Sequence, residues 1–183
     1  LALAAALYLA LSWAWVQVPL WGVDTSFGLP AVLKTRRFGY DGKGQAVLRA
    51  PADVAAAWER LGGRPLILEG FVPFSRELSV IAVRSRSGEF RHYPPTRNWH
   101  ERGVLSASLA PVPDLGAIEQ MAVAHARALA EHLDYVGSFA LELFEHEGHL
   151  LGNEMAPRVH NSGHWTIEGA VCSQFENHLR AVL

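Results

Sequence analysis

The feature that most constrains this chain is a pair of expected strands whose second member ends at a proline. In residues 136–145, Phe139, Leu141 and Leu143 alternate with Ala140, Glu142 and Phe144, so that the two sets face opposite sides of a strand. Residues 150–154 can pair with this strand because Glu147 and Gly148 supply a turn. Pro157 follows at once, and proline cannot donate a hydrogen bond to a sheet. The sequence therefore predicts a β-hairpin from which the chain departs abruptly at this proline.

A loop dense in polar and charged side chains follows the hairpin. It carries the guanidinium of Arg158 and the imidazoles of His160 and His164. Loops held by a rigid scaffold often carry binding and catalytic residues, so we interpret this segment as part of a site. The alternative is a solvated polar loop, which we rank second because Trp165 and Ile167 give the segment apolar anchors.

Two glutamates, Glu142 and Glu154, fall on the two strands of the expected hairpin, near one another across the sheet. Neighbouring carboxylates repel each other unless a cation lies between them. Mg²⁺ suits that role because it prefers oxygen ligands and takes others from water and substrate phosphates. The pair therefore predicts a magnesium site, with the side-chain oxygen of Asn153 beside it. Two separate glutamates facing solvent would leave their coincidence unexplained.

The rest of the chain, from Leu29 onward, predicts antiparallel strands with few helices between them. We expect strands at residues 31–35, 46–48, 66–72, 77–86, 89–93 and 104–109. Helices are expected at residues 51–61, at residues 115–133 with Asp114 as the cap, and at residues 168–183. Such an order indicates an α+β fold rather than a doubly wound sheet.

A basic, glycine-punctuated loop at residues 36–45 joins the first two expected strands. Its backbone N–H groups, with Lys34 and Lys43 alongside, can cradle phosphate oxygens, although no Walker motif is present. The alternative is an ordinary hairpin tip. The expected strand at residues 66–72 can bind a base edge through its backbone, and Glu77 can accept hydrogen bonds from ribose hydroxyls.

Residues 1–23 carry no charged side chain and are long enough to cross a bilayer. No Lys or Arg precedes them, whereas a signal peptide normally begins with a basic region. We therefore expect a helix buried against another domain, or sequence foreign to the natural protein, rather than a membrane span. The formal net charge of −2 gives no electrostatic indication of nucleic-acid binding, and the single cysteine, Cys172, fits a reducing compartment.

Three segments together resemble the 5-(carboxyamino)imidazole ribonucleotide synthases, a family of ATP-grasp ligases in purine biosynthesis. The segments are P-A-V-L-K-T-R-R-F-G-Y-D-G-K-G-Q from Pro30, R-E-L-S-V-I-A-V-R from Arg76, and N-E-M-A-P-R-V-H-N-S-G-H-W-T-I-E-G-A from Asn153. The third is the most specific, and the resemblance runs from Leu29 to the last residue. Gly70 departs from the family pattern, in which an acid is common at this position.

The resemblance implies an ATP-grasp fold, in which two lobes with antiparallel sheets grip ATP. It assigns residues 29–97 to a small lobe with the glycine-rich loop and residues 98–183 to a large lobe with the magnesium and acceptor-side loop. Residues 1–28 stay unassigned. It also implies that the amino-terminal and carboxyl-terminal domains of the full enzyme are missing, and that the full enzyme is a cytoplasmic homodimer without a membrane partner.

The implied reaction uses ATP to join bicarbonate to aminoimidazole ribonucleotide, with Mg²⁺ as the metal. The resemblance implies Lys34, Arg158 and His160 as catalytic residues and Glu142 and Glu154 as metal ligands. The ATP-binding residues that it implies are Lys34, Gly39, Tyr40, Asp41, Gly42, Lys43, Gly44, Gln45, Glu69, Gly70, Phe71, Val72, Glu77, His100, Asn153 and Glu154. Two alternatives stay open: another ATP-grasp carboxylase or ligase with a different acceptor, and an inactive nucleotide-binding fragment.

Overall fold

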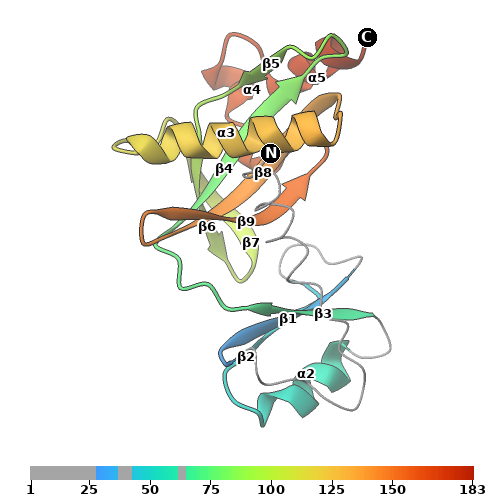
Figure 1. Ribbon diagram of the computed structural model, residues 1–183, viewed down its shortest axis with the longest axis vertical. Coiled ribbons are helices and arrows are strands. Elements are labelled where there is room, and N and C mark those ends of the chain that lie inside the picture. Colours follow the sequence, from blue (N-terminus) through green and yellow to red (C-terminus); the bar gives the residue numbers. More distant parts are fainter. Residues whose placement is uncertain (1–27, 37–42, 62–64) are drawn as a thin grey trace. The chain divides into compact units, whose positions relative to one another are not determined.

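The computed structural model describes residues 28–36, 43–61 and 65–183, which form two compact units (Figure 1). The three-stranded unit contains the described residues up to Pro73 and also Arg102–Val104, and the six-stranded unit contains Phe74–Glu101 and Leu105–Leu183. The division falls near residue 73, whereas the sequence placed the lobe boundary near residue 97. The difference arises because β4 (Arg76–Arg84) pairs along its whole length with β8 (Gly137–His146) in one sheet.

The three-stranded unit is an antiparallel sheet with one helix. Its elements are β1 (Ala31–Thr35), β2 (Gln45–Leu48), α2 (Asp53–Leu61) and β3 (Leu66–Gly70), with the strands in the order β2-β1-β3. Leucines and alanines from the sheet and from α2 form its core. The helix begins at Asp53, because Pro51 and Ala52 form a turn before it. The Asp53 carboxylate reaches back to accept hydrogen bonds from the backbone N–H groups of Arg49 and Ala50.

The six-stranded unit is built on one antiparallel sheet in the order β7-β6-β4-β8-β9, with β5 paired to the other end of β4. The remaining strands are β5 (Phe90–His92), β6 (Thr96–Glu101), β7 (Val104–Leu109) and β9 (His149–Ala156). The expected strands and the hairpin are confirmed. The sequence did not predict β6, whose residues T-R-N-W-H-E show little apolar alternation.

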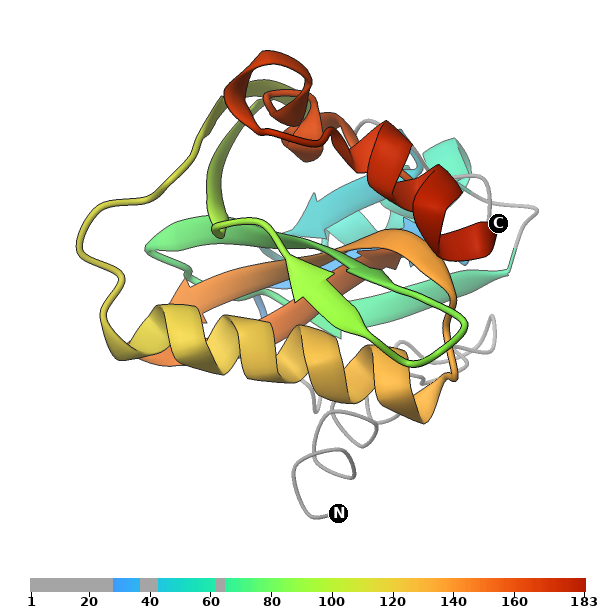
Figure 2. The same cartoon turned by 90° about the horizontal axis from the view of Figure 1, so that it is seen from above.

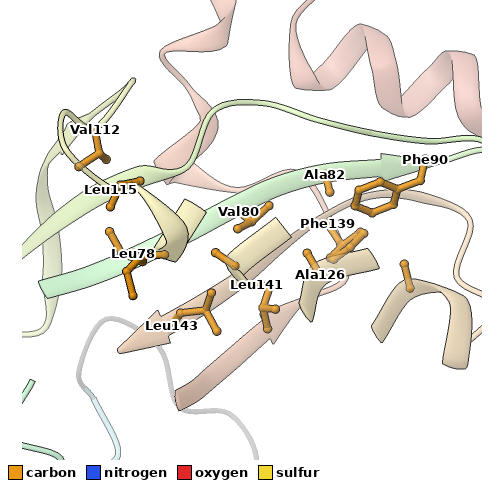
Figure 3. Close-up of a cluster of buried hydrophobic side chains, with 13 residues drawn as sticks. Leu78, Val80, Ala82, Phe90, Val112, Leu115, Ala126, Phe139, Leu141 and Leu143 are labelled. Atoms are coloured by element: carbon orange, nitrogen blue, oxygen red, sulfur yellow. The ribbon is translucent and has the colours of Figure 1, made fainter. Parts of the chain in front are cut away.

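Helix α3 (Ala117–His132) covers one face of this sheet (Figure 2). Leu78, Val80 and Ala82 of β4 and Phe139, Leu141 and Leu143 of β8 gather in the core beneath it (Figure 3). The expected Asp114 cap is wrong. Gly116 occupies the N-cap position, and Asp114 adopts a positive φ of 57° in the preceding turn.

The carboxyl-terminal segment packs on the opposite face of the same sheet (Figure 2). There, Trp165 contacts the cluster formed by Ile81, Tyr93, Ala140 and Ala156. This segment contains the short 3₁₀ helix η2 (Asn161–Gly163), α4 (Thr166–Gly169) and α5 (Gln174–Val182). The expected single helix over residues 168–183 is wrong, because Ala170 is extended. Ser173 then starts a new helix by accepting a hydrogen bond from Glu176 N at 3.2 Å.

A β-bulge in the β8–β9 hairpin decides which residues face the same side. His146 pairs with His149 and Leu143 with Gly152, but Glu142 pairs with Glu154, so Asn153 is an extra residue. Because side chains alternate along a strand, Glu154 would face the α3 side without this insertion. The bulge therefore brings both carboxylates to the face opposite α3.

No described helix combines the length and the apolarity that crossing a bilayer requires. The argument about a membrane span concerned residues 1–23, which lie outside the described residues.

Candidate active site

The carboxylate pair lies where the hairpin predicted it, with Glu142 and Glu154 directly opposite one another on β8 and β9. The Asn153 side chain donates a hydrogen bond from Nδ2 to Glu142 Oε2 at 3.3 Å. Burial raises the pKa of Glu142, and the negative charge of Glu154 raises it further. A bound cation would offset both effects, so the two carboxylates fit a divalent metal ion.

The described residues contain no group of three or more His, Cys, Asp or Glu side chains placed to hold a metal ion. A metal site built only from protein side chains is thus not formed there. Two carboxylates with an amide oxygen nearby match the sparse protein ligation of Mg²⁺, which keeps waters and takes substrate phosphates as ligands.

His160 reaches back over the sheet to this pair. Its Nε2 lies 3.3 Å from Glu142 Oε1, and its Nδ1 lies 2.8 Å from Ser162 Oγ. Burial, together with the neighbouring charge of Arg158, lowers the pKa of His160 to about 4. The imidazole is therefore neutral at pH 7, and its contact with Glu142 is a close polar contact rather than an ion pair.

Two further residues expected at the nucleotide site, Glu77 and His100, are joined to each other. His100 Nδ1 lies 2.6 Å from Glu77 Oε2, across the neighbouring strands β4 and β6. This hydrogen bond raises the pKa of His100. The charge of His100 in turn lowers the pKa of Glu142, which places the pair within the electrostatic reach of the carboxylates.

The loop after Pro157 is anchored rather than solvated along its length. Ser162 and Thr166 are fully buried, and the indole of Trp165 donates to Thr96 Oγ1 at 3.3 Å. Arg158 is exposed, and its Nη1 donates to the carbonyl of Val159 at 3.0 Å. The alternative of a merely solvated loop is thus wrong, and Arg158 is an exposed cation beside the partly buried imidazole of His160.

The sequence missed the buried polar residues that hold this loop. Ser79 pairs in register with Glu142 and donates to Ser162 Oγ at 2.8 Å. Gln174 Oε1 accepts from His160 N at 2.9 Å, and its Nε2 donates to His160 O at 2.6 Å. Position 163 favours glycine, since a Cβ there would lie 2.7 Å from Gln174 Oε1. A lone serine inside the apolar strand β4 was the available signal.

The three-stranded unit holds the other expected nucleotide residues. Lys34 Nζ lies 2.5 Å from Glu69 Oε2, and both side chains are partly exposed. Strand β3 ends at Gly70, so Phe71 and Val72 lie beyond the strand rather than within it as expected. A Cβ added at Gly70 would have no heavy atom within 4 Å, so a larger residue fits there.

The glycine-rich loop is described only in part. Gly44 accepts a hydrogen bond from Thr35 N at 2.7 Å, and Gln45 begins β2. Lys43 is described, whereas the expected phosphate-binding residues Gly39, Tyr40, Asp41 and Gly42 lie outside the described residues.

Comparisons with known proteins agree on one family. A family model described as an ATP-grasp domain matches residues 16–175. The N5-carboxyaminoimidazole ribonucleotide synthase of Pseudomonas aeruginosa is 57% identical over 166 residues, which are 91% of this chain and 46% of that protein. The synthase of Bacillus subtilis is 48% identical over 155 residues, which are 84% of this chain and 41% of that protein.

Solved structures show the same similarity. The N5-carboxyaminoimidazole ribonucleotide synthetase of Thermus thermophilus matches with a TM-score of 0.77 and 58% identity, over 85% of this chain and 42% of that one. The synthase of Aspergillus clavatus in complex with ADP and 5-aminoimidazole ribonucleotide matches with a TM-score of 0.80 and 35% identity, over 87% of this chain and 41% of that one. The chain thus spans less than half the length of these relatives.

Proposed function

Since this chain belongs to the ATP-grasp family, we propose that it forms part of an enzyme that carboxylates 5-aminoimidazole ribonucleotide with bicarbonate at the expense of ATP. The product would be N5-carboxyaminoimidazole ribonucleotide, an intermediate of purine biosynthesis. The observation that carries this proposal is the Glu142–Glu154 pair beside His160 and Arg158. It occurs in a chain that is 57% identical to an N5-carboxyaminoimidazole ribonucleotide synthase.

The reaction that we propose has two steps. A bicarbonate oxygen attacks the γ-phosphorus of ATP, which gives carboxyphosphate and releases ADP. The amine of the ribonucleotide then forms a bond to the carboxyl carbon, phosphate leaves, and the amine loses a proton. The main demand on the protein is to position the reactants and to neutralise the charge on the transferring phosphoryl group.

Each candidate residue has a role in this proposal. Glu142 and Glu154 would hold Mg²⁺, which when bound neutralises phosphate charge. Lys34 and Lys43 would contact phosphate oxygens as cations. Arg158 would bind bicarbonate or carboxyphosphate oxygens through its planar set of donors, which its exposure leaves accessible.

The other ATP-binding residues keep the roles that the resemblance implies. Glu69, Gly70, Phe71 and Val72 would hold the base, and Glu77 with His100 the ribose. His100 already satisfies one oxygen of Glu77 at 2.6 Å, so a ribose hydroxyl would share that carboxylate with the imidazole. The glycine-rich loop through Gln45 would contact phosphates, and Asn153 would support the metal ligands.

The test is to measure ADP release and the transfer of label from bicarbonate to an acid-labile product, omitting one substrate at a time. The proposal requires that label enter the acid-labile product only when ATP, bicarbonate and aminoimidazole ribonucleotide are all present. ADP release that needs bicarbonate but not the ribonucleotide would report the first step alone. In an enzyme that contains this chain, the absence of labelled product with all three substrates present would contradict the proposal.

We also propose that the enzyme acts in the cytoplasm as a homodimer. The free thiol of Cys172 suits a reducing compartment, whereas the dimer rests on the family resemblance alone. Cell fractionation and light scattering test the two statements separately.

A further inference from the structure

A chain of hydrogen bonds leads from Asn98 through Ser79 and Ser162 to the Nδ1 edge of the His160 ring. Asn98 Nδ2 donates to Ser79 Oγ at 3.0 Å, Ser79 Oγ donates to Ser162 Oγ at 2.8 Å, and Ser162 Oγ lies 2.8 Å from His160 Nδ1. Ser79 and Ser162 are fully buried, and Asn98 is 4% exposed. Ser108 Oγ also donates to Asn98 Oδ1 at 2.9 Å.

The direction of these bonds determines where the His160 proton lies. The amide nitrogen of Asn98 can only donate, so Ser79 accepts from it and uses its own hydrogen toward Ser162. Ser162 accepts that hydrogen, which leaves its own hydroxyl hydrogen available to Nδ1 at 2.8 Å. The backbone N–H of Ser162 donates to Asn161 Oδ1 at 3.0 Å and also points to Nδ1, at 3.4 Å. Nδ1 is therefore an acceptor, and the single ring proton resides on Nε2, facing Glu142 Oε1 at 3.3 Å.

The backbone of His160 is fixed independently of this chain of hydroxyls. Gln174, which is fully buried, holds both the N–H and the carbonyl of His160, and its own N–H donates to Thr166 Oγ1 at 3.0 Å. The ring is thus carried on a rigid support, and the serines determine its tautomer and its rotation. In many proteins, a hydrogen bond at one ring nitrogen of a histidine fixes the ring proton on the other nitrogen. This bond thereby determines which nitrogen can donate and which can accept.

We propose that Ser79, Ser162 and Asn98 are positioning residues that hold His160 in the Nε2–H tautomer, with Nε2 beside Glu142. The consequence for catalysis rests on the proposed function. In this tautomer His160 offers a hydrogen-bond donor, not a base, to the carboxylate pair and to a substrate oxygen beside it. The proton that leaves the ribonucleotide amine would therefore pass to another acceptor than Nε2 of His160.

The test is nitrogen NMR of the full chain labelled at histidine, without substrates, with His160→Gln to identify the signals. Wild-type protein is expected to show Nδ1 at the position of an unprotonated nitrogen and Nε2 at that of a protonated one. Ser162→Ala and Ser79→Ala are each expected to shift the tautomer ratio by about fivefold toward Nδ1–H, the equivalent of one hydrogen bond. Both serine variants are used in case one of them does not fold, and thermal unfolding identifies the variants that are folded.

The matched control is Ser138→Ala. Ser138 lies on β8 of the same sheet and is 1% exposed, and its Oγ has no hydrogen-bond partner among the described residues. Removing this hydroxyl is expected to leave the His160 signals unchanged. A wild-type Nδ1–H tautomer would overturn the proposal, as would a ratio that folded Ser79→Ala and Ser162→Ala proteins leave unaltered. Because this measurement needs no turnover, a failed carboxylation assay beside the expected tautomer shift would reject only the proposed function.

Discussion

The two units hold two charged or titratable pairs of the candidate site in different ways. In the six-stranded unit the side chains of Glu142 and His160 are 16% and 11% exposed, and each is bonded to residues from other elements. In the three-stranded unit the side chains of Lys34 and Glu69 are 27% and 31% exposed and form an ion pair within one sheet. Loss of one partner leaves an unsatisfied group in the first case, whereas solvent replaces it in the second.

The difference teaches how the two parts of the proposed reaction are served. Metal binding and acceptor chemistry need fixed protonation states and fixed orientations, which the buried network around His160 supplies. Phosphate contact needs a cation of sufficient reach, and a lysine on a partly exposed sheet provides one without a rigid surrounding.

Arg158 breaks the correlation between burial and function, because it is exposed yet lies beside the buried network. In the carboxylating enzyme, Arg158→Ala is expected to lower carboxylation about a hundredfold, or about 3 kcal/mol, and to leave Mg·ATP affinity nearly unchanged. This change removes a charged hydrogen-bond donor from the proposed bicarbonate site and leaves the proposed nucleotide contacts in place. Labelled-bicarbonate incorporation and nucleotide titration measure the two effects.

Arg91→Ala is the control for this change, since Arg91 is an exposed arginine on β5 that pairs with Glu89. It should alter neither quantity. If Arg158→Ala weakened Mg·ATP binding as strongly as carboxylation, Arg158 would be a nucleotide ligand and its assignment to bicarbonate would be incorrect.

The pH dependence of stability sharpens the comparison. The pKa of His160 falls from 6.5 to about 4 on folding, so the unfolded chain binds more protons between these values and stability rises with pH across this window. Relative to His160→Gln, wild-type stability should increase by at most about 3 kcal/mol from pH 4 to pH 6.5.

Glu142 acts in the opposite direction, because its raised pKa makes stability fall as the pH rises through that value. It is present in both proteins, and Gln at position 160 keeps a polar group beside it, so the difference between them reports mainly on His160. Urea unfolding at several pH values measures it, with the exposed His149→Gln as control. A difference that does not change with pH would mean that His160 titrates alike in the folded and unfolded chains.

The smallest expected effect on stability is in the three-stranded unit. Lys34→Ala should change the free energy of unfolding by less than about 1 kcal/mol, because partly exposed ion pairs contribute little. The same change should weaken Mg·ATP binding about tenfold, as expected for loss of one charged contact. Arg49 is an exposed cation beside β2. As the control, Arg49→Ala should leave both the free energy of unfolding and the affinity for Mg·ATP unchanged. Equal nucleotide affinities in the two variants would remove Lys34 from the site.

The α+β class and the ATP-grasp fold were predictable from the sequence, and both are confirmed. The hairpin was predictable because the alternation of residues 136–145 and the Glu147-Gly148 turn are local signals. The pairing of Glu142 with Glu154 was predicted correctly, but the bulge at Asn153 that produces it was not. Simple counting from the turn would set Glu142 opposite Asn153.

The supports of His160 could not be predicted, because they depend on contacts between residues far apart in the sequence. Ser79 and Ser162 are 83 positions apart, and nothing local indicates that a loop after β9 returns to β4. The break between α4 and α5 was also missed, because the extended Ala170 sits in a sequence with ordinary helical residues on both sides. Strand β6 was missed because it lacks apolar alternation.

The most direct measurement is a calorimetric titration of the protein with ADP, with and without Mg²⁺. Glu142→Gln and Glu154→Gln are expected to weaken Mg·ADP binding by about tenfold or more, since even indirect supports of a metal site contribute about that much. Both should leave metal-free ADP binding unchanged. Glu119→Gln, on the exposed surface of α3 over the other face of the sheet, is the control and should bind as wild type does. Mg·ADP affinity that is the same in all four proteins would contradict the assignment of the Glu142–Glu154 pair as the metal site.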